Sequence, residues 1–222
     1  MNLSELEFNI SEIFYSIQGE GTRMGERCIF VRMQGCLLRC SWCDTPYALD
    51  LKHQEIKMNG IELYNQIKQY QCKFVEFTGG EPLEQPNIIY IINKLLDEDY
   101  TVAIETAGYK DISILDKKVI KIMDIKCPDS NMSNKNNYRN IDFLSKNDEI
   151  KFVIASEKDY IWAKELIYKY RLDNIVNCIL FSPAFGIINY KDLAEWILRD
   201  NLNVRFQIQL HKYIWTPDTR GV

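Results

Sequence analysis

Three cysteines lie close together near the start of the chain, Cys36, Cys40 and Cys43, in a C-x3-C-x2-C spacing. Thiolates on one short loop can each bind an iron of a cubane iron-sulfur cluster, which normally takes four protein ligands. An iron without a protein thiolate can accept a chelating molecule through amino and carboxylate groups. The spacing therefore favours a [4Fe-4S] cluster with one iron open to a cofactor.

The same triplet allows two other interpretations. A zinc site could use the three thiolates and recruit a fourth ligand, for which the histidines of the chain are His53 and His211. The cysteines could also simply pack. The chain has seven cysteines, an odd number, and three of them are clustered instead of being spread along the chain. Both features disfavour the disulfide framework of a secreted protein. The other four are too far apart to share a loop, and we expect each to be a small buried hydrophobic side chain: Cys28, Cys72, Cys127 and Cys178.

A second candidate segment, Thr78-Gly79-Gly80-Glu81-Pro82, follows the next apolar run after the cysteines. Glycines let the backbone approach a ligand closely and expose N–H and C=O groups that a side chain would shield. Many strands end in glycine turns, so this motif alone is weak. Its position one strand after the cysteine loop makes it a strong indication of a ligand site.

Short apolar runs alternate with amphipathic stretches along most of the chain. We predict strands at residues 9–15, 28–33, 74–77, 102–104, 119–125, 150–154, 175–181 and 204–208, and helices at residues 61–70, 87–96, 159–170 and 190–198. Strands that alternate with helices pair in parallel through crossovers, so we expect an α/β barrel or partial barrel. Residues 129–140, dense in Asn and Ser, interrupt this rhythm and are interpreted as a mobile surface loop.

Length and charge narrow the class of protein. With 222 residues, 46% of them hydrophobic, the chain can bury one substantial core, and we expect a single domain over residues 1–222. A net charge of -4 and a pI near 5.4 make nucleic acid an unexpected partner. The acidic N-terminus and the absence of a stretch of about 20 apolar residues indicate a cytoplasmic protein without a membrane partner.

The cysteine triplet, including the aromatic Trp42 before its last cysteine, resembles the signature of the radical S-adenosylmethionine (SAM) superfamily. The resemblance implies a partial (β/α) barrel of parallel strands with outer helices, and a cluster loop after the first strand. It also implies that Cys36, Cys40 and Cys43 hold the [4Fe-4S] cluster that cleaves SAM to a 5'-deoxyadenosyl radical. In that superfamily a segment like Gly79-Gly80-Glu81-Pro82 contacts the amino group of SAM.

Three further segments resemble one branch, the 7-carboxy-7-deazaguanine synthases: residues 16–21 (SIQGEG), residues 30–35 (FVRMQG) and residues 42–45 (WCDT). The resemblance spans nearly the whole chain. It implies a lyase of queuosine and 7-deazapurine biosynthesis that contracts the ring of 6-carboxy-5,6,7,8-tetrahydropterin to 7-carboxy-7-deazaguanine and releases ammonia. SAM is regenerated in this family and acts as a cofactor.

The resemblance also assigns roles to residues. Thr45 is expected to bind Mg2+ that holds the substrate carboxylate, although it could instead cap the turn before Pro46. The expected substrate-binding residues are Ile17, Gln18, Gly19, Glu20, Arg32, Thr78 and His211. The expected SAM-binding residues are Trp42, Cys43, Asp44, Gly80, Glu81, Asp124, Ile125, Lys126, Ser182 and Pro183.

Physical reasons accompany the main substrate residues. The Gln18 amide offers donors and an acceptor, and the Glu20 carboxylate can pair with a ring N–H and an amino group. The Arg32 guanidinium can fork onto a substrate carboxylate, although a strand Arg more often makes an ordinary salt bridge. A lone His such as His211 is likewise more often structural.

Two rival functions remain open at this stage. An activase that generates a glycyl radical on a partner protein carries the same triplet but has no need of Gln18, Glu20 or Thr45. An electron carrier or zinc-binding module would need a fourth protein ligand and no SAM. The family resemblance further implies a homodimer and a flavodoxin or ferredoxin-like electron donor. The chain departs from the family at Leu37, where Asn is common, but this position supplies no ligand.

Overall fold

The computed structural model describes residues 2–52 and 55–222, so His53, one of the two zinc-ligand candidates, lies outside the described residues. Within these ranges nine strands form one sheet in the order β3-β1-β2-β4-β5-β6-β7-β8-β9. The strands are β1 (Glu7–Ile17), β2 (Arg27–Met33), β3 (Ile56–Asn59), β4 (Phe74–Gly79), β5 (Thr101–Thr106), β6 (Ile120–Asp124), β7 (Glu149–Ile154), β8 (Cys178–Pro183) and β9 (Arg205–Phe206).

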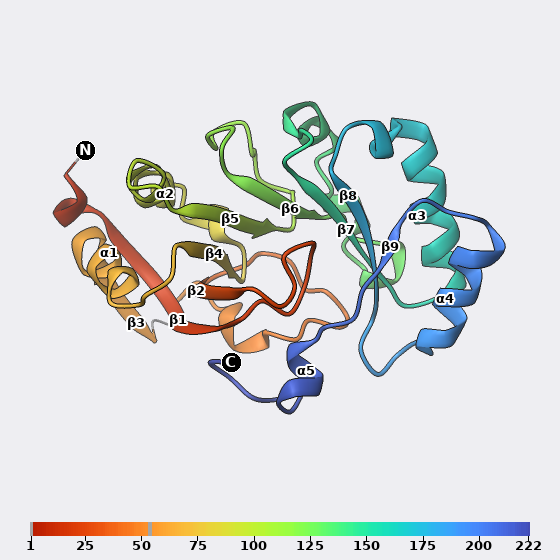
Figure 1. Ribbon diagram of the computed structural model, residues 1–222, viewed down its shortest axis with the longest axis horizontal. Coiled ribbons are helices and arrows are strands. Elements are labelled where there is room, and N and C mark those ends of the chain that lie inside the picture. Colours follow the sequence, from red (N-terminus) through yellow and green to blue (C-terminus); the bar gives the residue numbers. More distant parts are fainter. Residues whose placement is uncertain (1, 53–54) are drawn as a thin grey trace.

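The sheet is parallel over most of its width. From β2 to β9 every neighbouring pair runs in the same direction, whereas β1 pairs antiparallel with both β2 and β3. The order has two ends, β3 and β9, so the sheet does not close (Figure 1). The predicted α/β fold, a partial barrel of parallel strands, is confirmed, and an antiparallel β3–β1 pair extends it at one edge.

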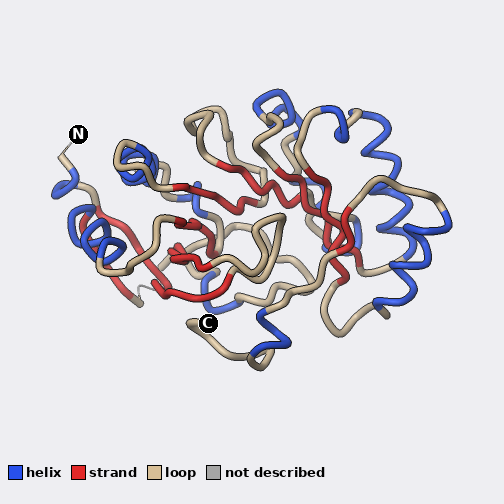
Figure 2. Tube along the Cα trace, viewed as in Figure 1, coloured by secondary structure: helices blue, strands red, loops and turns tan. Residues whose placement is uncertain are grey.

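The helices lie outside the sheet. Figure 2 shows the strands in the middle of the molecule and the helices at its periphery. The four predicted helices are present as α1 (Gly60–Lys68), α2 (Ile88–Leu96), α3 (Glu157–Tyr170) and α4 (Tyr190–Arg199), and a short α5 (His211–Ile214) follows β9. Of the described helices, none has the length and apolar character that a membrane crossing requires.

The two faces of the sheet carry different residues because side chains alternate along a strand. On β2, Ile29, Val31 and Met33 are buried in the main core, which includes buried residues of the outer helices. Phe30 belongs to a separate, smaller apolar cluster with residues of β1, β4 and β5. Arg32 is on the same face as Phe30. The interior of the partial barrel therefore changes from apolar to charged toward the carboxyl ends of the parallel strands.

Several element boundaries differ from the prediction. The apolar pattern misses β3, because this four-residue edge strand is only half-buried and lacks a clear alternation. The strand predicted at 204–208 is reduced to Arg205–Phe206, and the one predicted at 175–181 is found at Cys178–Pro183. His211, expected just after a strand, instead begins α5.

The interpretation of residues 129–140 as a mobile surface loop is wrong. This segment forms short 3-10 turns at Pro128–Ser130, Ser133–Lys135 and Tyr138–Phe143, and Ser130 and Asn140 are buried. The Asn140 amide donates to the carbonyls of Gly108 and Lys110 at 2.8 and 2.7 Å and accepts from the N–H of Ile112. The Asn side chains of this segment supply hydrogen-bond partners that the backbone of a turn lacks. Composition alone does not reveal this role.

We expect Asn140→Ala to lower the free energy of unfolding by about 2–4 kcal/mol, because it leaves one N–H and two carbonyls of the 108–112 segment without their partner. Urea denaturation followed by circular dichroism measures the change. Asn134→Ala, in the same segment but exposed, is the control and should stay within about 0.5 kcal/mol. Equal effects of the two substitutions would contradict the structural role of Asn140.

Candidate functional site

The cysteine loop leaves the carboxyl end of β2 and is fixed by backbone hydrogen bonds at both ends. The N–H of Gly35 donates to Ala48 and that of Cys36 donates to Leu49, at 2.8 and 3.1 Å. Inside the loop, the N–H of Cys43 donates to the carbonyl of Cys40. These contacts close the loop into a compact arch. The expected position of the cluster loop, directly after the first parallel strand, is confirmed.

The three thiols of this loop fit an iron-sulfur cluster in their chemistry. All three are free of disulfide bonds; Cys36 is buried, and Cys40 and Cys43 are half-buried. Burial, opposed by the charge of Lys126 and assisted by those of Asp124, Cys43 and Cys36, raises the pKa of Cys40 to about 11. Among the described residues no three His, Cys, Asp or Glu side chains converge on one metal ion. A cubane binds each thiolate at a different iron, so its ligands need not converge on one point.

The glycine segment packs directly against the cysteine loop. The N–H of Gly80 donates to Met33 and that of Glu81 donates to Gly35, at 3.0 and 2.8 Å. A Cβ on Gly80 would contact the carbonyl oxygen of Gly35 and stand 2.6 Å from that of Ala48, closer than real Cβ atoms approach an oxygen. Only glycine lets the two backbones meet, so the expected register of the two motifs is confirmed.

Glu81 has a structural role for its side chain. Its carboxylate is fully buried and accepts hydrogen bonds from the N–H of Leu83, the hydroxyl of Thr106 and the N–H of Ala107, at 3.1, 2.8 and 2.8 Å. The glycine segment is thereby tied to the end of β5. Because the side chain of Glu81 is engaged in these hydrogen bonds, only its backbone is available to contact SAM.

The other residues expected along SAM follow β6 and β8. Asp124 ends β6; its Oδ2 accepts from Lys126 at 2.8 Å, while its Oδ1 is buried without a partner in the structure. Ser182 and Pro183 end β8 and are buried. The Ile125 side chain is part of the main core, so only its backbone is available. An orphaned carboxylate oxygen on the strand-end rim fits a site for a polar ligand.

Thr45 lies where the cysteine loop and the glycine segment meet. Its hydroxyl is 3.5 Å from the carbonyl of Gly79 and 3.9 Å from the sulfur of Cys43. Although Thr45 precedes the 3-10 turn Pro46–Ala48, its side chain makes no capping hydrogen bond. Thr45 thus occupies the N-cap position of this turn through its backbone, as the alternative interpretation expected, but its hydroxyl does not cap the turn and points to Gly79 and Cys43.

Arg32 is held by an ion pair on the inner face of β2. Its Nε donates to Glu12 at 2.7 Å, and the hydroxyl of Tyr47 donates to the same carboxylate oxygen at 2.9 Å. Burial opposes the charge, but Tyr47 and Glu12 outweigh it and raise the pKa of Arg32. The adjacent Thr78, in register with Arg32, is 3.4 Å from a carboxylate oxygen of Glu105. The ordinary salt bridge expected as the alternative role of Arg32 is present. It uses the Nε of Arg32 and orients the rest of the guanidinium.

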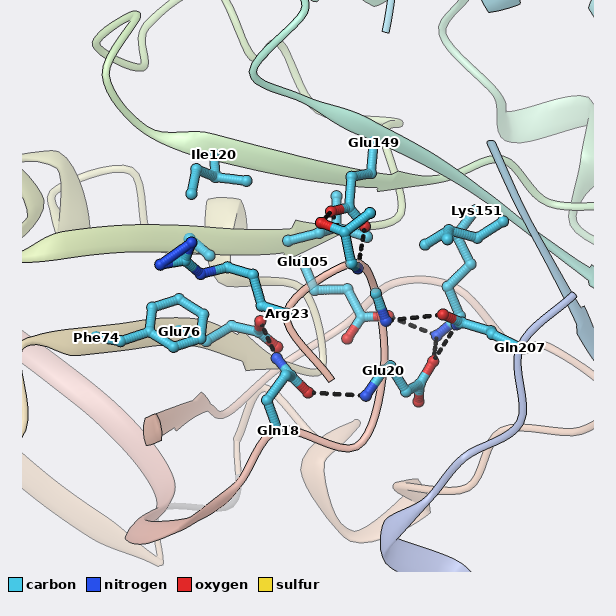
Figure 3. A pocket seen from close by; sticks show the side chains of 15 residues that line it. Gln18, Glu20, Arg23, Phe74, Glu76, Glu105, Ile120, Glu149, Lys151 and Gln207 are labelled. Atoms are coloured by element: carbon cyan, nitrogen blue, oxygen red, sulfur yellow. Dashed lines mark hydrogen bonds and ion pairs between the residues drawn. The ribbon is translucent and has the colours of Figure 1, made fainter. Parts of the chain in front are cut away.

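Gln18 points into the partial barrel. Its Nε2 donates to Glu76 on β4 at 2.5 Å, and its Oε1 accepts from the N–H of Glu20 at 3.1 Å (Figure 3). Burial raises the pKa of Glu76 well above its usual range, and the charges of Glu105 and Glu20 act in the same direction. The expectation of a free amide for the substrate is thus modified, because both polar ends of Gln18 already position the loop that carries Glu20.

Glu20 is surrounded by three donor side chains from two segments. Lys151 on β7 lies 2.5 Å from its Oε2, Gln207 donates to the same oxygen at 3.1 Å, and Gln209 donates to Oε1 at 2.9 Å. None of these three partners is among the residues predicted from the sequence. A lysine inside the apolar run 150–154 was the available signal for Lys151, and two glutamines at alternate positions after β9 were the signal for the others.

Gln209 also connects Glu20 to the cysteine loop. Its Nε2 donates to Asp44 at 3.0 Å, and Lys212 donates to the same carboxylate oxygen at 3.1 Å. Burial acts to raise the pKa of Asp44, but Lys212 and the hydrogen bond from Gln209 outweigh it and hold the pKa below its usual range. One glutamine side chain thus bridges the expected substrate loop and the expected SAM loop.

His211 packs on the expected substrate loop as well. A Cβ on Gly19 would collide with the His211 ring, and the carbonyl of Gly19 accepts from the N–H of Leu210 at 3.0 Å. Burial lowers the pKa of His211, against the opposing charge of Glu20. The expected residues from the N-terminal loop and from α5 are therefore brought together, and His211 is neighbour to Glu20 and not part of the cysteine cluster.

The pocket in Figure 3 is the lower part of this interior. It is lined by Gln18, Glu20 and Lys151 and by residues that begin strands, such as Phe74 and Ile120. Its cavity volume is about 20 Å³, which is of the order of a single water molecule.

We expect Gly80→Ala to separate the glycine segment from the cysteine loop and to cost about 2 kcal/mol or more of stability, because the new methyl meets two backbone carbonyls. Iron and sulfide content after anaerobic reconstitution should fall. Gly186→Ala is the control: a Cβ there meets nothing within 4 Å, so this variant bears only the backbone strain of an alanine at a φ of +72° and should keep its iron content. Full iron content in Gly80→Ala would refute the requirement for close packing.

Known proteins share both the sequence and the fold of this chain. The model of the radical SAM superfamily matches residues 30–198. The chain is 43% identical to a 7-carboxy-7-deazaguanine synthase of Chlorobaculum tepidum, over 99% of each protein. It is 39% identical to one of Koribacter versatilis, over 96% of this chain and 99% of that protein.

Solved structures agree in fold. The crystal structure of QueE from Escherichia coli matches with a TM-score of 0.75 at 21% identity, over 92% of this chain and 95% of that one. SuiB of Streptococcus suis, bound to S-adenosylmethionine, matches with a TM-score of 0.51 at 13% identity, over 79% of this chain and 45% of that one. By sequence, this chain belongs to the radical SAM superfamily and, within it, to the 7-carboxy-7-deazaguanine synthase family.

Proposed function

We propose that this chain converts 6-carboxy-5,6,7,8-tetrahydropterin to 7-carboxy-7-deazaguanine and ammonia in queuosine or 7-deazapurine biosynthesis, with a [4Fe-4S] cluster, SAM and Mg2+ as cofactors. The observation that carries the proposal is the Gln209 bridge between Glu20 and Asp44. It holds the loop suited to a pterin edge beside the loop suited to a cluster and SAM. A glycyl-radical activase or an electron carrier has no use for this arrangement.

Cluster and SAM, when bound, supply the radical that removes the hydrogen atom at C6 of the pterin, and the chain positions the reactants. Cys36, Cys40 and Cys43 hold the cluster. Gly80 offers a backbone that a ligand can approach, and Asp124 offers its unused carboxylate oxygen. The glycine segment and the rim after β6 and β8 therefore form the SAM side of the site.

The substrate side consists of complementary charges. The Arg32 guanidinium, oriented by Glu12, is suited to the carboxylate at C6 of the pterin. The hydroxyl of Thr45, which donates only a long hydrogen bond to Gly79, can complete a Mg2+ shell through its oxygen, together with substrate oxygens and waters. Glu20 and His211 are neighbours, on the N-terminal loop and α5, and are suited to the pyrimidine edge. The ring that loses ammonia is then held at its carboxylate and at its pyrimidine edge.

The remaining partners follow from the proposed chemistry. A reduced flavodoxin or ferredoxin-like protein would deliver the electron that the cluster passes to SAM. We further propose a homodimer, in keeping with the family resemblance.

We expect reconstituted protein with SAM, Mg2+, reductant and the pterin to form 7-carboxy-7-deazaguanine, detected by mass spectrometry, without matching consumption of SAM. Cys40→Ala should lose the cluster absorbance and turnover by at least about 1000-fold while keeping the circular dichroism of the fold, because the cluster loses one thiolate. Turnover by Cys40→Ala would refute the radical mechanism. Cleavage of SAM with the pterin untouched would refute the substrate.

Thr45 provides a separate test of the metal. We expect Thr45→Val to lower pterin turnover about 10- to 100-fold and to abolish its dependence on Mg2+, because the metal loses a hydroxyl ligand. Cluster content and SAM binding should be unchanged, since Thr45 provides no thiolate. Thr45→Ser, which keeps the hydroxyl, should retain the Mg2+ response. Unchanged Mg2+ dependence in Thr45→Val would exclude Thr45 as a ligand.

A further inference from the structure

Lys151 is a buried cation inside the partial barrel. It lies in the middle of β7, in register with Asp124 of β6 and Leu180 of β8. Its side chain is 7% exposed and extends into the interior, where Figure 3 shows it beside Glu20 and Gln207. A charge at such a position is costly unless it is paired. Its partners therefore indicate why the strand carries a lysine there.

The Lys151 ammonium bridges two carboxylates from distant parts of the chain. Its Nζ is 2.5 Å from Oε2 of Glu20, on the N-terminal loop, and 2.8 Å from Oε1 of Glu105, on β5. Burial opposes its charge, but Glu105 and Glu20 outweigh it and hold the pKa of Lys151 well above its usual range. The lysine therefore stays charged and acts as a fixed cation instead of a proton carrier.

The surroundings of Glu20 are rich in acids. Glu76, Glu105 and Glu149 line the same pocket. The other cationic side chain on the described lining is Arg23, which stacks on the ring of Phe74 and pairs with Glu26. Of the two cationic side chains on the described lining, Lys151 is thus the one that compensates the charge of Glu20. On the side of α5, His211 and Lys212 lie near, but Lys212 is engaged with Asp44.

The bonds made by Glu20 also limit how it can meet a ligand. Lys151, Gln207 and Gln209 supply three donors, and a carboxylate has about four acceptor positions. One acceptor position remains for a ring N–H or an amino group. The direction of that position is set by the three donors, of which Lys151 is the charged one.

We propose that Lys151 is a positioning residue for the pterin, acting through Glu20: it holds the Glu20 carboxylate in place for the pyrimidine edge and ties the substrate loop to β5. This inference rests on the proposed function. In the described part of the chain, the Lys151 side chain pairs with Glu20 and Glu105 and makes no ion pair or hydrogen bond to the cysteine loop or the glycine segment. Its charge also acts electrostatically on Asp124 and Asp44. Its effect is therefore expected to be larger on pterin affinity than on SAM affinity.

The test is a double-mutant cycle on binding. Reconstituted protein with SAM is titrated with 6-carboxypterin, an unreactive oxidised analogue, by calorimetry, for the wild type, Lys151→Met, Glu20→Gln and the double variant. We expect Lys151→Met to weaken pterin binding at least about 10-fold in the wild-type background and less than about 2-fold in the Glu20→Gln background. KM for the pterin should rise more than kcat falls.

Two controls separate positioning from stability. Lys151→Arg keeps the charge and should restore most of the affinity. Lys164→Met removes a lysine that pairs with Asp200 on the outer surface at 2.7 Å, and it should leave pterin binding unchanged. SAM affinity should change less than about 2-fold in every variant.

Each outcome decides the proposal. An equal loss of affinity from Lys151→Met in both backgrounds, or no loss at all, overturns it. If Lys151→Met alone does not fold, Glu20→Gln and the neutral double variant are compared, and a further 10-fold loss on removing the lysine, on the scale of about 1.4 kcal/mol, overturns it. Absence of pterin binding by the folded, reconstituted wild type instead refutes the proposed function.

Discussion

Charge compensation inside the open sheet is the constraint on which the site depends. Parallel strands place their inward side chains in one enclosed space, and here that space holds Glu20, Glu76, Glu105 and Glu149. Charges cannot remain there without partners. Lys151 balances two of the carboxylates, and burial favours the neutral form of Glu76. This compensation lets the fold remain stable with polar side chains in its interior. The same charged side chains can also bind a substrate.

The site unites segments from the two ends of the sequence. The loop after β1 is connected to the segment after β9 by backbone and side-chain hydrogen bonds: the N–H of Leu210 donates to the carbonyl of Gly19, and the N–H of Gly21 donates to Oε1 of Gln207. The same C-terminal segment reaches Asp44 of the cysteine loop through Gln209. The segment after β9 therefore positions the substrate loop and the cofactor loop relative to each other, although it carries no part of the family's cysteine or glycine motifs.

Buried polar side chains elsewhere in the chain serve the backbone. Glu81 satisfies two N–H groups and a hydroxyl at the end of β5, and Asn140 satisfies three backbone groups of the following segment. Each fixes a loop at the carboxyl ends of the strands, where irregular backbone lacks the pairing of a sheet. Precise loops at this rim thus require interior polar residues that take no part in chemistry.

The sequence by itself determined the alternating elements and the cluster loop, because hydrophobic periodicity and the spacing of Cys36, Cys40 and Cys43 are local properties of the chain. The motif Gly79-Gly80-Glu81-Pro82 also predicted that Gly80 lies in the site. Tertiary structure decided what depends on distant contacts: the antiparallel β3–β1 edge, the ordered turns of residues 129–140, and the partners of Glu20. Lys151 and Gln209 are far from Glu20 in sequence, so no local pattern could join them; only the curvature of the open sheet and the return of the C-terminal segment bring them together.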